Sequence, residues 1–197
     1  MVRDAEGASR RALLARAGAG LAGVGALLLD GCGSTAATAE QTATQTTTPA
    51  SPAAADQDIA ILSRALDLER RTVSAYVAGI PLLPRPLAQA AQQFLSEELE
   101  HTGELISLIK TSGGTAGPRA NSYPLGHPTD ATEVIALLHS LETMQIDYYL
   151  QSIPRLSPGP TRAAVATILT VDAQHVTMLR LSLGQTPVPS AFVTGLE

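Results

Sequence analysis

The chain has 197 residues, 45% of them apolar, and a formal net charge of −5, which fits one globular domain with extensions. It has no tryptophan, a single lysine (Lys110) and no run of basic residues, so its composition argues against nucleic-acid binding. Its single cysteine, Cys32, excludes an intramolecular disulfide, a cysteine-based zinc site and a dithiol redox pair.

Residues 1–31 have the layout of a signal peptide, with a charged start followed by a short apolar core. The apolar run, residues 17–29, is too short to form a stable membrane-spanning helix. The arginine pair Arg10 and Arg11 resembles a twin-arginine export signal. We therefore expect an extracytoplasmic location in a bacterium.

The apolar run ends at a Leu-Asp-Gly-Cys segment that resembles a lipobox, in which Cys32 is lipidated and becomes the mature N-terminus. Asp30 stands where a small or apolar residue is usual, so a plain cleaved signal with an incidental cysteine stays open. Residues 32–55 are mostly Ala, Thr, Ser, Gln and Pro, which predicts a disordered tether. Together these features predict a domain anchored to the cell membrane by an N-terminal lipid.

The first predicted helix spans residues 56–78. Its buried stripe has the alternating spacing of four and three residues that is typical of a helix packed on one side. The stripe consists of Leu62, Leu66, Glu69, Val73 and Tyr76. Three prolines within residues 81–86 cannot continue a helix and predict a turn.

A second stripe predicts a second helix that ends at the Ser-Gly-Gly stop of residues 112–114. This stripe consists of Ala91, Phe94, Glu98, His101, Leu105 and Leu108. The neighbouring acids Glu97, Glu100 and Glu104 are interpreted as a solvated face. A loop rich in Gly, Pro and Asn follows the second helix.

Asp130 and Glu133 form a capping-box pattern that predicts the start of a third helix. Its stripe consists of Ile135, Leu138, Glu142, Ile146 and Tyr149. After a Ser-Pro-Gly-Pro turn, a fourth stripe follows, with Val165, Ile168, Asp172, His175 and Leu179. Residues 186–197 are predicted to be a tail, and no segment alternates as a β-strand would.

These four helices predict an all-α four-helix bundle over residues 56–185, made of two helix pairs with short turns. The loop between the second and third helices is much longer than an antiparallel return needs. About 20 residues at roughly 3.3 Å each could run the full length of a ~30 Å helix. We therefore predict one long crossover, which makes the second and third helices parallel.

Both helix pairs carry the same arrangement of polar residues within their apolar stripes. Two acid-x-x-His segments, Glu98 with His101 and Asp172 with His175, place acid and imidazole on one helix face. Glu69 lies 29 residues before the first segment and Glu142 lies 30 before the second, and each midpoint falls in a turn. Points equidistant from a turn lie at the same height, so the six side chains should meet.

A buried, unpaired carboxylate costs several kcal/mol or takes up a proton, and four together also repel one another. Two divalent cations would balance four carboxylates, with two neutral imidazoles as nitrogen ligands. This ligand set suits iron or manganese, with zinc also open. The alternative is an ion pair between one of the acids and Arg70, Arg71 or Arg180, in a bundle without metal.

This arrangement resembles the ferritin-like di-iron and di-manganese carboxylate proteins, in which one helix of each pair gives a Glu and the other a Glu-x-x-His. The resemblance implies that Glu69 and Glu142 are single carboxylate ligands, that Glu98 and Asp172 bridge the ions, and that His101 and His175 are terminal nitrogen ligands. Asp172 is one methylene shorter than the usual Glu, which weakens the expected bridge. Tyr76 and Tyr149 are interpreted as core residues that could also hydrogen-bond to the ligands or relay electrons.

The resemblance implies a dinuclear iron or manganese cofactor that reacts with dioxygen or peroxide, either in ferrous oxidation or in peroxide removal. The alternative is a non-enzymatic bundle that serves in extracytoplasmic interaction or stress protection. Expected partners are metal ions, small oxygen species and the membrane, and a homodimer stays open. Assembly into a storage cage is disfavoured, because a lipid and tether would be awkward on a closed shell.

Overall fold

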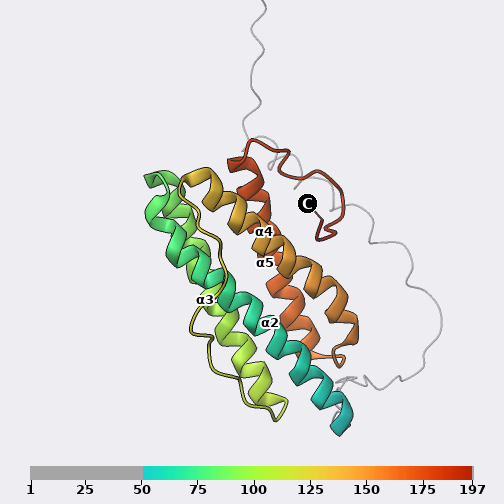
Figure 1. Cartoon of the computed structure of the whole chain (residues 1–197). Coiled ribbons are helices and arrows are strands. Elements are labelled where there is room, and N and C mark those ends of the chain that lie inside the picture. The colour runs from blue at the N-terminus through green and yellow to red at the C-terminus, as the bar shows by residue number, and fades with distance from the viewer. Residues whose placement is uncertain (1–50, 197) are drawn as a thin grey trace, which may run out of the picture. The chain divides into compact units, whose positions relative to one another are not determined.

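The computed structural model describes residues 51–196. Within them the chain forms four α-helices and two short 3-10 helices, without a strand (Figure 1). The α-helices are α2 (Pro52–Gly79), α3 (Arg85–Thr111), α4 (Ala131–Ser152) and α5 (Pro160–Ser182), and the 3-10 helices are η1 (Ile80–Leu82) and η2 (Ile153–Arg155). The prediction of an all-α four-helix bundle is confirmed. The predicted signal peptide, the lipidated Cys32 and nearly all of the tether lie outside the described residues.

The helix directions confirm the long crossover. Helices α2 and α3 run antiparallel, as do α4 and α5, while residues 112–130 run from one end of the bundle to the other (Figure 1). As a result α3 and α4 point the same way, as predicted. None of the helices in the described part is long and apolar enough to cross a membrane.

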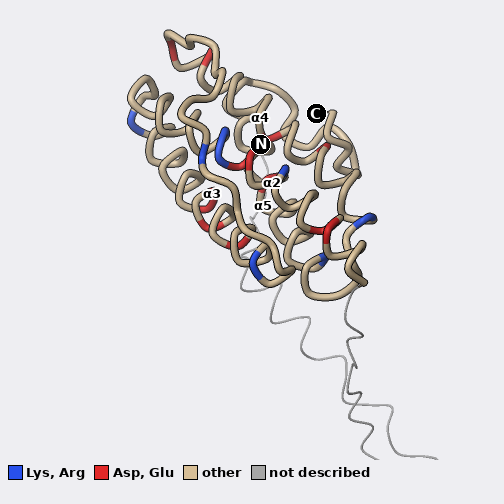
Figure 2. Tube along the Cα trace, turned by 60° about the horizontal axis from the view of Figure 1, so that its bottom comes forward, with Lys and Arg blue, Asp and Glu red and all other residues tan. Residues whose placement is uncertain are grey.

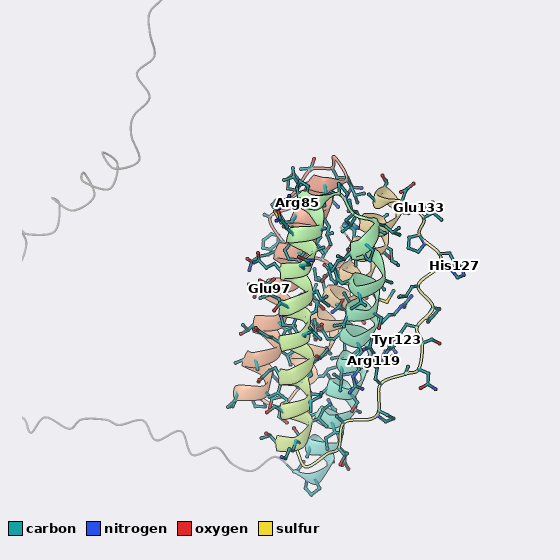
Figure 3. The ribbon with its side chains drawn as sticks, turned by 90° about the vertical axis from the view of Figure 1, so that its left-hand side faces the viewer. Arg85, Glu97, Arg119, Tyr123, His127 and Glu133 are labelled. Atoms are coloured by element: carbon teal, nitrogen blue, oxygen red, sulfur yellow. The ribbon has the colours of Figure 1, made fainter. Side chains whose placement is uncertain are left out.

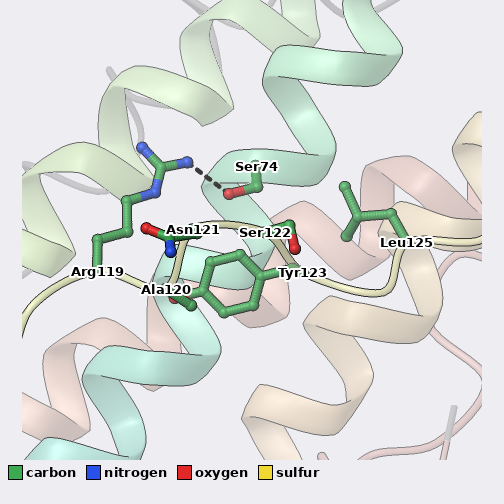
Figure 4. A pocket seen from close by; sticks show the side chains of 7 residues that line it. All are labelled: Ser74, Arg119, Ala120, Asn121, Ser122, Tyr123 and Leu125. Carbon is green, nitrogen blue, oxygen red and sulfur yellow. Dashed lines mark hydrogen bonds between the residues drawn. The ribbon is translucent and has the colours of Figure 1, made fainter.

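The crossover is fastened to α2 by arginine side chains. Arg70 donates to the carbonyl oxygen of Gly117 at 2.8 Å, and Arg71 donates to that of Pro124 at 3.1 Å. These two arginines therefore hold the loop, so the alternative in which one of them pairs with a core acid is wrong. Arg119 reaches back to the hydroxyl of Ser74 at 2.5 Å, over a surface pocket of about 460 Å³ (Figure 4).

Two helix starts follow from side-chain caps. The Ser51 hydroxyl accepts from the backbone N–H of Ala54, so α2 begins four residues before the expected boundary at 56. The carboxylate of Asp130 accepts from the N–H of Glu133 at 2.9 Å, as predicted for the start of α4. The Glu133 carboxylate bonds one residue further back than in a standard capping box, to the N–H of Thr129.

Two glycines mark places where the chain packs too closely for a side chain. A Cβ on Gly79, at the end of α2, would lie 2.6 Å from Cγ1 of Val134 on α4. In the predicted tail, Gly195 adopts φ +75°, and a Cβ there would lie 2.6 Å from Cα of Asp147. The tail therefore reaches α4. Helix α4 in turn packs against α2, and both Glu69 on α2 and Glu142 on α4 are buried in the interior.

The apolar core is divided into two clusters. The first, around the turn between α4 and α5, contains Ile61, Leu62, Ala65, Leu66, Leu105, Leu108, Ile109, Tyr149, Leu156, Val165 and Ile168. The second, around the turn between α2 and α3, contains Ala75, Tyr76, Ala91, Val134, Ile135, Leu138, Leu141 and Leu179. Along every helix the predicted polar residues lie between the members of these two clusters, so a polar layer lies at mid-height.

The four sides of the bundle are not packed equally. The α2–α3, α4–α5 and α2–α4 pairs pack extensively, whereas α3 and α5, which form the fourth side, contact each other much less. In the described part, lysines and arginines are scattered rather than gathered into one patch (Figure 2). The loosely packed α3–α5 side is where the polar layer comes closest to solvent.

Candidate metal centre

All six predicted ligands come together in the polar layer. Helix α2 contributes Glu69, α4 contributes Glu142, and α3 and α5 each contribute an acid and a histidine. Every one of the six is buried, with exposed fractions between 0 and 7%. The full set is Glu69, Glu98, His101, Glu142, Asp172 and His175. Residues at equal distances from a turn therefore do lie at the same level along the bundle, as the sequence predicted.

The ligand atoms form two groups, in each of which the atoms lie within 4.8 Å of one another. The Glu69 group consists of Glu69, His101 and Asp172. The Glu142 group consists of Glu98, Glu142, Asp172 and His175. Asp172 belongs to both groups, so its shorter side chain still places a carboxylate between them.

Both imidazoles direct Nδ1 into the centre. His101 Nδ1 lies 3.4 Å from Oδ1 of Asp172 and 3.6 Å from Oε1 of Glu98. His175 Nδ1 lies 3.3 Å from the same Oε1 of Glu98 and 3.3 Å from Oε1 of Glu142. One oxygen of Glu98 therefore lies near both histidines, but of the two predicted bridging carboxylates only Asp172 belongs to both groups, whereas Glu98 belongs only to the Glu142 group.

The donor set fits metal ions, because its polar atoms lack other partners. Among the described residues, seven buried side-chain nitrogen and oxygen atoms of these six residues have no hydrogen-bond partner. The seven are Oε2 of Glu69, Oε1 of Glu98, Nδ1 of His101, Oε2 of Glu142, both carboxylate oxygens of Asp172 and Nδ1 of His175. Native interiors rarely leave such atoms unsatisfied, and cations bound at this point would satisfy all of them.

In the absence of metal, the cluster holds protons. Burial, reinforced by the charge of Glu98, raises the pKa of Glu69 to about 8. Burial and the neighbouring carboxylates also raise the pKa of Asp172 well above its usual range. Burial alone would lower the pKa of both histidines, but the surrounding carboxylates raise that of His101 to about 9 and that of His175 to about 11. Divalent ions would replace these protons as the compensating positive charge.

Tyr76 and Tyr149 each donate a hydrogen bond to a candidate ligand on the other helix, so that the two bonds link α2 and α4 in both directions. Tyr76 on α2 donates to Oε1 of Glu142 on α4 at 2.7 Å, and Tyr149 on α4 donates to Oε1 of Glu69 on α2. Burial and the adjacent carboxylates raise the pKa of both phenols well above the usual value, so each stays a neutral donor. Each bond leaves Oε2 of the same carboxylate without a hydrogen-bond partner, and Oε2 of Glu69 lies 3.7 Å from Nδ1 of His101.

Three further contacts escaped the sequence analysis. Gln145 donates to Oε2 of Glu98 at 3.4 Å and accepts from the hydroxyl of Thr72 at 2.5 Å. Thr72 lies three residues after Glu69, and Gln145 lies three residues after Glu142. This spacing places each on the same helix face as the acid, so the sequence could have identified both. Glu97 was assigned to a solvated face, but its carboxylate lies 2.7 Å from Nε2 of His175. Nothing in the local sequence distinguishes it from its neighbour Glu100.

A cleft of about 280 Å³ connects this layer to the surface between α3 and α5. Its lining includes both histidines of the centre together with Phe94, Glu97, Val171 and Met178. Figure 3 shows Glu97 on the side of α3 toward α5, whereas the crossover residues Arg119, Tyr123 and His127 lie beside α2. The crossover therefore leaves this approach to the centre uncovered.

Comparison with known proteins agrees with the fold. Residues 33–185 match the sequence model of a ferritin-like domain. A conserved hypothetical protein from Mycobacterium tuberculosis is similar in structure, with a TM-score of 0.64 at 23% identity over 72% of this chain and 99% of that one. A structure from Bacillus anthracis strain Ames, described as ferritin-like, diiron-carboxylate proteins, has a TM-score of 0.59 at 18% identity over 66% of this chain and 97% of that one.

No curated protein matches the chain in sequence. At these identities the two solved structures establish the fold, and the family match spans most of the chain. The protein therefore belongs to the ferritin-like domain family.

Proposed function

We propose that this protein is an exported, membrane-tethered metalloprotein that binds two iron or manganese ions and reacts with dioxygen or peroxide. The observation that carries the proposal is the convergence of seven unpartnered buried polar atoms from four helices on one point. The description of the Bacillus anthracis structure as a diiron-carboxylate protein supports the same reading.

In this proposal the Glu142 group and the Glu69 group each hold one ion and share Asp172. Mixed carboxylate and imidazole ligands suit iron and manganese. Two such ions side by side would bind and polarise a small oxygen species and exchange electrons with it.

The protein's own contribution is positioning and access. The two phenols hold Glu69 and Glu142 in place, and the apolar clusters above and below exclude water. The cleft between α3 and α5 gives ions and small oxygen species a path to the histidines. Such a site is preorganised, because its ligands belong to packed helices rather than to loops.

Metal content is the decisive test. We expect the purified full chain, freed of metal and reloaded without oxygen, to bind about two Fe²⁺ or Mn²⁺ ions per chain and to melt at a higher temperature. Mixing the Fe²⁺ form with dioxygen or with hydrogen peroxide then identifies the faster oxidant. Absence of bound metal after reloading, with an unchanged melting temperature, would favour the non-enzymatic alternative.

Export and tethering are supported by the sequence alone. A lipid on Cys32 would hold the domain near the membrane, with residues 33–51, which precede α2, as a spacer. Mass spectrometry of the mature N-terminus should find a diacylglyceryl cysteine in the membrane fraction. A Cys32→Ser variant should lose it, and membrane retention of that variant would contradict the proposal.

A further inference from the structure

Glu97 contacts one of the two imidazoles of the centre. Its carboxylate lies 2.7 Å from Nε2 of His175, while Nδ1 of the same ring faces the oxygens of Glu98 and Glu142 at 3.3 Å. A carboxylate accepts a hydrogen bond but cannot donate one when ionised, so Nε2 must carry a proton here. This contact leaves the lone pair of Nδ1 for a metal ion and makes the ring a stronger donor.

The second half of the chain has no counterpart to this carboxylate. Glu97 directly precedes the acid of the first acid-x-x-His segment, and the residue directly preceding Asp172 is Val171. Both side chains line the same cleft. Val171 offers no acceptor to a histidine, so the approximate two-fold repetition of the centre is broken at this pair.

A second difference lies one turn earlier on the same helices. Phe94 stacks on the ring of His175, with centroids 4.2 Å apart and planes inclined by 30°. The corresponding position on α5, four residues before Asp172, is Ile168. His175 is thus fixed by a carboxylate and by a stacked aromatic ring, and the corresponding positions for His101 are both aliphatic.

We propose that the two metal positions are unequal, and that Glu97 is the positioning residue that makes the Glu142 group fill first. This inference rests on the proposed function, because it presupposes that both groups bind metal. The Glu142 group has four candidate ligands against three in the Glu69 group. An anionic partner on a ligating histidine typically changes metal affinity by about 10- to 100-fold.

Titration of the metal-free full chain with Mn²⁺, followed by electron paramagnetic resonance, tests this order. At one equivalent we expect the six-line signal of an isolated ion, and at two equivalents its replacement by a coupled pair. The first dissociation constant should be at least about tenfold smaller than the second.

Variants separate the role of Glu97 from general attraction by the acidic cleft. Glu97→Ala should weaken the first binding step by about tenfold or more and leave the second within about threefold. Glu97→Gln keeps an acceptor without the charge and should fall between Glu97→Ala and the natural protein. Glu100→Gln removes a charge from the same cleft, and neither step should change appreciably. Val171→Glu should strengthen the second step, because it restores the missing carboxylate.

The Glu97 side chain is one-third exposed, so its substitution should leave the bundle folded. The melting temperature of each metal-free variant checks this. Two ions bound in a single step would overturn unequal filling, and equal losses in Glu97→Gln and Glu100→Gln would overturn the role of Glu97. Both outcomes would leave the proposed function standing. A natural protein that binds no Mn²⁺ and no Fe²⁺ would overturn both.

Discussion

The phenol of Tyr76 on α2 donates a hydrogen bond to Glu142 on α4, and it does so at 2.7 Å across the interior of the bundle. The reciprocal bond runs from Tyr149 on α4 to Glu69 on α2. Each tyrosine lies seven residues after the acid of its own helix. The pair of bonds thus joins the two hairpins and positions two candidate ligands at the same time.

Removal of either phenol should weaken both fold and metal binding. Tyr76→Phe or Tyr149→Phe leaves a buried carboxylate oxygen without its donor, which should cost about 1–3 kcal/mol of unfolding free energy. Urea unfolding of the metal-free protein measures this loss. Tyr148→Phe is the matched control, because the half-buried Tyr148 donates to a backbone oxygen of Ile61 and not to the centre. Equal losses in all three variants would contradict a special role for the crosswise pair.

The metal-free protein should become less stable as pH rises. Folding raises the pKa of Glu69 from 4.5 to about 8, that of His101 from 6.5 to about 9, and that of His175 from 6.5 to about 11. Between pH 4.5 and 9 the folded chain therefore binds more protons than the unfolded chain, so unfolding free energy falls with rising pH.

Bound metal should remove or reverse this trend, because ions replace the protons and bind best to deprotonated ligands. Thermal melting at pH 5.5 and 8.5, with and without Mn²⁺, measures both effects. At a free ion concentration about 100 times the dissociation constant, the added stability should be about 2.7 kcal/mol. A metal-free protein that melts higher at pH 8.5 than at pH 5.5 would contradict the assignment.

The Asp172 carboxylate should lower the stability of the metal-free protein and raise its affinity for metal ions. It is fully buried, and this burial, reinforced by three neighbouring acids, raises its pKa. Asp172→Asn keeps the volume and removes an ionisable carboxyl, so the metal-free variant should unfold at the same or a higher urea concentration.

The same variant should lose affinity for both ions, since Asp172 belongs to both groups. Glu142→Gln, which alters only the Glu142 group, should spare one ion. Metal analysis after equilibrium dialysis distinguishes the two cases. Full occupancy of both positions in Asp172→Asn would show that this carboxylate does not bridge.

A pair of glycine substitutions tests how closely α2 and α4 pack. Gly79→Ala would place its Cβ 2.6 Å from Val134 and should lower stability by about 1–3 kcal/mol. Gly103→Ala on α3 meets no atom within 4 Å, so it should raise stability by up to about 1 kcal/mol through helix propensity. Chemical denaturation of both variants gives the comparison, and a neutral Gly79→Ala would refute the close approach.

The sequence predicted the helices and the six central side chains because all of them follow one physical rule. An acid or histidine within an apolar stripe of helical spacing must face the core, and equal distance from a turn fixes its height. Glu97 lies outside the stripe by one position, so its contact with His175 depends on where α5 packs. Arg70 and Arg71 were unpredictable for a similar reason, because their acceptors are carbonyls of a loop without periodicity.

The division of ligands between the helices has a consequence for assembly. The Glu69 group takes two residues from the first hairpin and one from the second, and the Glu142 group takes one from the first and three from the second. Neither hairpin alone can complete either group. Each captured ion would act as a clamp between the hairpins, so loss of metal should loosen the docking of the two halves before it melts any single helix.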